Sequence, residues 1–196
     1  MKILTKLIFI SLVISIMFVG CGEQDSTTES VLSNEVDTGQ ALNTTEQAIL
    51  KVINEARAKA RDCNDGRGLV GPSVALRWNN ELYASAYEHS NDLATSDTFS
   101  HLGSETDSDI TGSNLGKASR FNERIKANGY VSYSIIGENI AGGQETIESA
   151  LESWLASPAH CTNIMESEFT EIGVAIVVNP DSKYRVYWTQ NFGGKK

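Results

Sequence analysis

The C-terminal third of the chain constrains the fold most, because a helix-forming segment is followed there by two strand-forming segments. Within residues 147–155, apolar side chains recur at the i, i+3, i+4, i+7 and i+8 positions, which is typical of an amphipathic helix. Pro158 is expected to end this helix, because proline lacks an N–H and crowds the preceding turn. The β-rich runs 172–178 and 184–191, joined by the turn-forming residues 179–183, predict an antiparallel hairpin.

Three more helices are predicted in the earlier part of the chain. The first begins at the capping-box sequence of residues 44–47 and is broken at residues 62–66. The second begins at Asn79 or Asn80 and ends near Thr95, and the third covers residues 117–128 and ends at Gly129. Strands packed between helices indicate an α+β layered domain.

This domain is expected to span residues 46–194, the length of one ordinary domain, and it contains a long polar loop at residues 103–116. The loop sequence Asp107–Gly112 resembles the start of a calcium-binding loop. Ala118, however, stands where the acidic ligand of the twelfth position is expected, so a solvated loop is favoured over a calcium site.

The N-terminus predicts export. Lys2 and Lys6 flank the apolar run 7–20, which matches the basic and hydrophobic regions of a secretory signal and is short for a membrane span of about 20 residues. The end of the run, residues 18–21, resembles a bacterial lipobox. We therefore predict a signal peptide at residues 1–20 that is cleaved before a lipidated Cys21; the alternative is an ordinary signal peptide with a chance cysteine.

Residues 21–45 are expected to form the lipidated cysteine and a flexible tether, because the segment after Cys21 is polar and nearly free of large apolar residues. The whole chain has 16 basic and 25 acidic side chains, and loss of residues 1–20 removes Lys2 and Lys6, which leaves 14 basic side chains. Such an acidic protein has no electrostatic footprint for nucleic acid or an anionic bilayer. We therefore expect the protein to lie outside the cytoplasm and to be attached to the membrane through its lipid. If the cell is Gram-negative, the outer membrane is expected, because Cys21 is not followed by the Asp that often signals retention at the inner membrane. Free secretion is the alternative.

The cysteine count supports the same prediction. If Cys21 carries lipid, Cys63 and Cys161 remain as one even pair in an oxidising compartment, and we predict a disulfide between them. The alternative is that Cys161 is a nucleophile activated by His160. The disulfide is favoured, because neighbouring residues in a chain rarely point at one another.

Several short motifs together resemble one family. They occur in the order seen in the CAP superfamily, which is named after cysteine-rich secretory, antigen 5 and pathogenesis-related proteins and is also called SCP-like. They are most similar to the bacterial extracytoplasmic branch of that superfamily. The motifs lie at residues 76–82, 99–101, 137–141, 154–160, 173–174 and 187–193.

The resemblance implies a three-layer α-β-α sandwich with a central antiparallel sheet, and a secreted protein. It also implies a cleft lined by two histidines and two acidic residues, which holds a divalent metal such as zinc in some members. His101, Glu138 and His160 match three of these positions, whereas Ser157 stands nearest to the fourth. Two imidazoles and a carboxylate with an open position suit zinc and its bound water.

Structural roles are the alternative for these residues. Glu138 is then expected to accept backbone N–H bonds in a Gly-rich turn at residues 137–143, with the histidines donating to nearby acceptors. His89 lies on the inward face of its helix and is interpreted as a hydrogen-bonded core residue. The three tryptophans are interpreted as core anchors: Trp78, Trp154 and Trp188.

Two functions follow. The preferred one is a lipid-anchored binding module that holds a divalent metal, a small apolar ligand or a peptide. The other is a peptidase-like hydrolase that uses a metal-bound water, or His101 and Glu138 as acid and base. Common hydrolase and nucleotide-binding motifs such as Gly-x-Ser-x-Gly, HExxH and the Walker sequence are absent from the sequence, which leaves the question of catalysis open.

Overall fold

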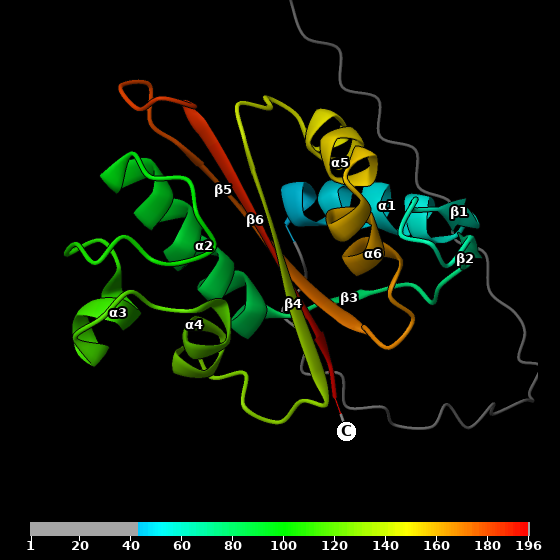
Figure 1. Ribbon diagram of the computed structural model, residues 1–196, viewed down its shortest axis with the longest axis horizontal. Coiled ribbons are helices and arrows are strands. Elements are labelled where there is room, and N and C mark those ends of the chain that lie inside the picture. The colour runs from blue at the N-terminus through cyan, green and yellow to red at the C-terminus, as the bar shows by residue number, and fades with distance from the viewer. Residues whose placement is uncertain (1–42, 196) are drawn as a thin grey trace, which may run out of the picture. The chain divides into compact units, whose positions relative to one another are not determined.

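Helices cover both faces of a central β-sheet in the computed structural model, which describes residues 43–195 (Figure 1). The predicted signal peptide, Cys21 and most of the predicted tether lie outside the described residues. One helical layer contains α1 (Thr44–Arg57), α5 (Ile147–Ala156) and α6 (Pro158–Met165), and the other contains α2 (Asn80–Ser96), α3 (Ile110–Leu115) and α4 (Phe121–Ala127).

The sheet has the strand order β3-β5-β6-β4. The predicted hairpin is confirmed: β5 (Glu171–Val178) pairs antiparallel with β6 (Val186–Gly194), and β4 (Ile135–Gly142) pairs antiparallel with the other side of β6. One detail differs from an all-antiparallel sheet, because the two-residue strand β3 (Arg77–Trp78) runs parallel to β5. A separate small hairpin, β1 (Arg61–Asp62) with β2 (Leu69–Val70), follows α1. The α+β sandwich is thus confirmed.

Helix ends agree with the sequence to within a few residues. The capping box of α1 is displaced by one residue: Asn43 accepts from the Glu46 N–H and Glu46 accepts from the Asn43 N–H, each at 2.9 Å. Asn79 caps α2 as predicted. The expected helix at residues 117–128 starts later, at Phe121, because Gly116 ends α3 in a left-handed conformation and the chain is extended at Arg120.

The long polar loop is more ordered than its composition suggests. It contains the short helix α3, which begins after Asp109. The Asp109 carboxylate is buried and accepts from the N–H groups of Gly112 at 2.9 Å and Ser119 at 3.0 Å. Asp109 therefore acts as a cap that ties both ends of the α3 segment together.

The expectation from proline is confirmed and the one from glycine is wrong. Helix α5 ends at Ala156, just before Pro158. Pro158 is also the first residue of a further helix, α6, where its missing N–H costs no helical hydrogen bond, so His160 lies within a helix. The predicted turn at residues 137–143 is absent, because residues 135–142 form the strand β4. Glu138 is consequently a mid-strand residue.

The largest hydrophobic cluster lies between the sheet and the layer of α1, α5 and α6. Trp154 and Trp188 are buried in it, and their indole N–H groups donate to the carbonyls of Ile140 at 2.9 Å and Gln144 at 2.7 Å. Trp78 packs against the same cluster. The interpretation of the three tryptophans as core anchors is confirmed.

The predicted disulfide is confirmed as well. Cys63 and Cys161 are bonded with a Cα–Cα distance of 5.5 Å, and both are buried. The bond joins the segment between β1 and β2 to α6. Because both sulfur atoms are used, the alternative of a nucleophilic Cys161 is wrong for this state of the protein.

The absence of a side chain at Gly173 allows α2 to lie directly against β5. A Cβ atom at this position would overlap the backbone of Leu82 and Tyr83 at the start of the helix. A Cβ at Gly142 on β4 would meet only side chains, the nearest being Tyr184 at 3.0 Å. Side chains can shift more easily than a helix backbone.

We predict that Gly173→Ala lowers the free energy of unfolding by about 1–3 kcal/mol or more, because α2 must move away from the sheet. Gly142→Ala is the matched control and should cost clearly less. Urea unfolding followed by far-UV circular dichroism measures both variants. Equal losses in the two would show that the contact between α2 and β5 does not require glycine.

Candidate functional site

The three residues matched to the family's metal positions come together at β4, the strand at the end of the sheet order. Glu138 lies on β4, His160 on α6, and His101 on the segment after α2. The Nδ1 of His101 donates to Oε1 of Glu138 at 2.9 Å, and the ring centroids of His101 and His160 are 6.3 Å apart. The two helical layers thus each contribute one histidine.

A buried arginine holds the Glu138 carboxylate. Nη2 of Arg124 donates to the two Glu138 oxygens at 3.2 and 2.9 Å, and both side chains are 1% exposed. The sequence analysis missed Arg124, because nothing in the neighbouring sequence sets it apart from Arg120 or Lys126. A buried carboxylate on a strand requires a cation, so the burial of Glu138 is the only feature that could have predicted a basic partner.

The same guanidinium fixes the segment that carries His101. Nη2 of Arg124 also donates to the His101 carbonyl at 3.1 Å, and Nη1 donates to the carbonyl and hydroxyl of Ser119 at 3.1 and 2.9 Å. Arg124 therefore positions both the backbone of His101 and the carboxylate that orients its imidazole.

These contacts keep Glu138 ionised. Burial acts to raise the pKa of its carboxyl, but His89, His101 and Arg124 together outweigh burial and lower that pKa. The carboxylate accepts from side chains of the α2–α4 layer, so the expected role of accepting backbone N–H bonds in a turn is wrong. Its interaction with His101 is the arrangement that fixes the tautomer and orientation of an imidazole.

The third histidine lies beside this pair. His89 on α2 is fully buried, its Nε2 donates to the Ser100 carbonyl at 2.9 Å, and the same atom is 3.9 Å from Glu138 Oε1. Burial lowers the pKa of His89, which favours its neutral form. The interpretation of His89 as a hydrogen-bonded core residue is confirmed, and the structure adds that it packs against the Glu138 carboxylate.

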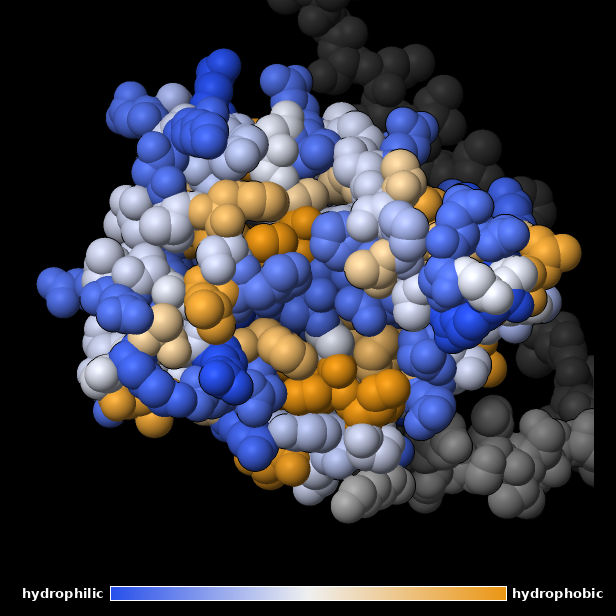
Figure 2. Space-filling model, viewed as in Figure 1, coloured by the Kyte–Doolittle hydropathy of each residue, from blue (hydrophilic) through white to orange (hydrophobic). Residues whose placement is uncertain are grey.

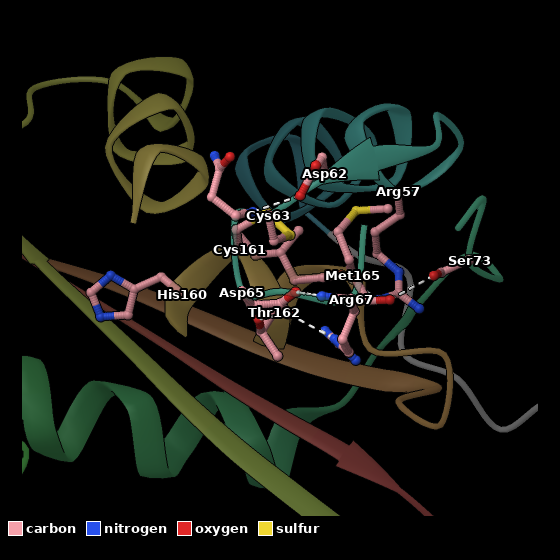
Figure 3. The surroundings of a disulfide bond; sticks show 12 residues. Arg57, Asp62, Cys63, Asp65, Arg67, Ser73, His160, Cys161, Thr162 and Met165 are labelled. Carbon is pink, nitrogen blue, oxygen red and sulfur yellow. Dashed lines mark hydrogen bonds and ion pairs between the residues drawn. A yellow bond between two sulfur atoms is a disulfide. The ribbon is translucent and has the colours of Figure 1, made fainter. Parts of the chain in front are cut away.

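His160 is held from two sides. Its carbonyl accepts from Nδ2 of Asn139 at 3.2 Å, and the next residue, Cys161, is joined to Cys63. Figure 3 shows the imidazole pointing away from this disulfide, while Thr162 of the same helix donates to Asp65 at 2.8 Å. Partial burial and the neighbouring His101 lower the pKa of His160, so its ring is neutral at neutral pH.

An amide network that the sequence analysis also missed connects α6 to the sheet. Nδ2 of Asn163 donates to Oδ1 of Asn139 at 2.9 Å and to the Glu138 carbonyl at 3.2 Å. Nδ2 of Asn139 in turn donates to Oε1 of Gln190 on β6 at 3.0 Å. Asn139 and Gln190 lie in the middle of strand-forming segments, where buried polar side chains need hydrogen-bond partners. Their presence there is the feature of the sequence that could have predicted this network.

The site presents two imidazoles whose nitrogens have not all been used. Within residues 43–195, Nε2 of His101 and both ring nitrogens of His160 make no hydrogen bond, whereas Glu138 is occupied by Arg124 and His101. In the same part of the chain, no group of three or more His, Cys, Asp or Glu side chains is arranged to hold one metal ion. Ser157, which stands nearest to the fourth family position, is the residue between α5 and α6.

The surface around β4 is mixed in polarity. Figure 2 shows hydrophilic residues across the middle of the face seen in Figure 1, with hydrophobic patches on either side. Phe99 and Leu102, which flank His101 in the chain, are 43% and 50% exposed. Exposed apolar side chains therefore lie on the segment that carries His101.

Comparison with known proteins gives a consistent family. The sequence model of the cysteine-rich secretory protein family, CAP, matches residues 50–192. The chain is 43% identical over 65 residues to the uncharacterized protein YkwD of Bacillus subtilis, covering 33% of this chain and 23% of that protein. It is 29% identical over 149 residues to the uncharacterized membrane protein YlbC of the same organism, covering 76% of this chain and 34% of YlbC. The chain thus spans only a minor part of each of these two relatives.

Solved structures show the same fold. An extracellular SCP-domain protein from Bacillus anthracis has a TM-score of 0.55 at 23% identity, covering 80% of this chain and 45% of that one. An outer surface protein from Borrelia burgdorferi has a TM-score of 0.58 at 20% identity, covering 81% of this chain and 100% of that one. None of the helices in the described part of the chain is long and apolar enough to span a bilayer.

We predict that Arg124→Leu lowers the free energy of unfolding by about 3–5 kcal/mol, because it leaves the Glu138 carboxylate buried without its cation. The Arg124→Leu/Glu138→Leu double variant should recover part of this loss, since no unpaired charge remains. Arg120→Leu, at the residue that precedes α4, is the control and should change little, because its side chain is exposed. Urea unfolding at neutral pH tests the set; equal effects at positions 120 and 124 would contradict the proposed role of the ion pair.

The pH dependence of stability has a defined sign. His89 has a lowered pKa in the folded protein, so the unfolded chain takes up its proton first as the pH falls below about 6.5. The lowered pKa of Glu138 also destabilises the folded protein as the pH falls. This effect begins near pH 4.5, the ordinary pKa of a glutamate, where the unfolded chain takes up the proton first. We predict that the unfolding free energy decreases as the pH falls, with a shallower slope just below neutrality in His89→Gln. An unchanged slope in that variant would contradict the assignment.

Proposed function

Because this chain belongs to the cysteine-rich secretory protein (CAP) family, we propose that it is an extracytoplasmic CAP-domain protein that binds a ligand between His101 and His160. The observation that carries the proposal is the orientation of His101. Glu138 holds its Nδ1 at 2.9 Å, which leaves Nε2 unpaired on a half-exposed ring beside His160. An imidazole fixed in this way is prepared for binding, because little side-chain freedom is lost when a ligand arrives.

A divalent metal, with zinc as the first choice, suits the two imidazoles. Neutral imidazole is a common zinc ligand, and the lowered pKa of His160 keeps that ring neutral. His101 and His160 would hold the ion, and Glu138 would orient His101 in the manner of a carboxylate–histidine–metal arrangement. When bound, zinc would supply a Lewis acid.

The exposed side chains of Phe99 and Leu102 support an apolar portion in the ligand, such as a small apolar molecule or a peptide. The likeness to an extracellular protein and to an outer surface protein supports a location outside the cytoplasm. We propose that a lipid on Cys21 attaches the protein to the cell-envelope membrane, in agreement with the predicted lipobox. Because the chain is acidic, we propose no interaction with nucleic acid.

A hydrolase is the second candidate, and one contact favours it. The hydrogen bond between His101 and Glu138 is the pairing of a base with the group that orients it, as in catalytic triads. Nε2 of His101 would take a proton from a water molecule or from a substrate hydroxyl. Hydrolysis of peptide or ester substrates that is lost in His101→Ala, with zinc affinity measured in parallel, would support this candidate; rates equal to the uncatalysed reaction would exclude it for those substrates.

We predict one-to-one zinc binding by the purified protein in a calorimetric titration, lost in the His101→Ala/His160→Ala double variant. Ser157→Ala, at the residue nearest to the fourth family position, is the control and should keep the affinity. Thermal unfolding of each variant shows whether the fold is intact. Absence of binding by the unaltered protein, or unchanged binding by the folded double variant, would rule out this metal site.

A further inference from the structure

A separate cavity of about 460 Å³ lies along the exposed face of α2, where α3 begins and α4 ends. Its volume is in the range of small-molecule sites. None of His101, Glu138 and His160 lines it, so it is distinct from the site proposed above. The cavity is lined mainly by Tyr83, Tyr87, Glu88, Asn91, Ile110 and Asn128.

Two tyrosines one helical turn apart form its aromatic wall. The ring centroids of Tyr83 and Tyr87 are 6.3 Å apart, and the rings are tilted by 35°. Tyr87 is 49% exposed and belongs to none of the buried hydrophobic clusters among the described residues. Neither hydroxyl group has a hydrogen-bond partner within residues 43–195. Tyr87 therefore exposes a large apolar ring and a free polar group where the core does not need them.

The polar side of the cavity offers hydrogen bonds without an available positive charge. Glu88 is buried and accepts from the Thr111 N–H at 2.8 Å and from Nδ2 of Asn128 at 2.7 Å. No Lys, Arg or His of the described residues forms an ion pair with it. The side-chain amide of Asn91 and Oδ1 of Asn128 make no hydrogen bond to any of the described residues.

These properties restrict the chemical class of the ligand. An anionic ligand, such as a fatty acid, is disfavoured, because the Glu88 carboxylate and the net charge of -9 on the protein both repel it. A purely hydrocarbon ligand would leave the amide of Asn91 and the hydroxyls of the tyrosines without partners. A pyranose ring has an apolar C–H face that packs on an aromatic ring and a rim of hydroxyls that donate and accept hydrogen bonds. We infer that this cavity binds a neutral sugar unit of a glycan.

The test is a titration of the isotope-labelled protein with maltotriose and with triacetylchitotriose, followed by amide NMR. We expect saturable shifts of α2 amides between Tyr83 and Asn91 with at least one of the two sugars. Tyr87→Ala should weaken binding about tenfold, because it removes the stacking surface, whereas Tyr87→Phe keeps the ring and most of the affinity. Asn91→Ala should weaken it as well.

Leu69→Ala is the control, because it removes an exposed apolar side chain that lines neither this cavity nor the site of His101 and His160. It should leave sugar affinity unchanged. The inference is overturned if neither sugar gives saturable shifts in the folded protein, or if the shifts centre on His101 and His160. Shifts of the same α2 amides caused by decanoate in the absence of any sugar effect would assign the cavity to lipids instead.

Discussion

The Glu138 carboxylate is an ionised group in the middle of a strand, and the structure around it is arranged to keep that charge inside. An isolated charge in such a place is too costly to persist, so a cation must reach it from another element. Arg124 does so from α4, and with its remaining N–H groups it binds the carbonyls of His101 and Ser119. One ion pair consequently fixes β4, α4 and the segment of His101 relative to one another.

The position of β4 at the end of the sheet order explains why the site forms there. The carbonyls of Glu138 and Ile140 accept hydrogen bonds from side chains of the α5–α6 layer, namely Asn163 and Trp154. Side chains thus occupy edge groups that would otherwise be available to pair with another strand. They also lock α5 and α6 against β4, so that His160 approaches the strand from one layer while His101 approaches from the other.

Features set by local sequence could be predicted, and features set by contact between distant elements could not. The periodicity of α2, the β5–β6 hairpin and the Cys63–Cys161 pair follow from spacing and parity. The strand β4 was misread because glycine usually marks a turn, whereas Gly137 and Gly142 make room for Phe169 and Tyr184. Arg124 and Glu138 lie on different elements and follow no shared period, so only the fold reveals that they pair.

The two histidines are held by different means, and this difference bears on how a ligand would be received. The helix of His160 is joined to Cys63 by a disulfide, and Arg57 donates to the carbonyls of Ile164 and Glu166 at its end. The segment of His101 has no covalent link of this kind; it depends on hydrogen bonds from Arg124 and His89. Both imidazoles are therefore in place before a ligand arrives. A covalent bond secures the helix of His160, and buried hydrogen bonds from Arg124 and His89 secure the segment of His101.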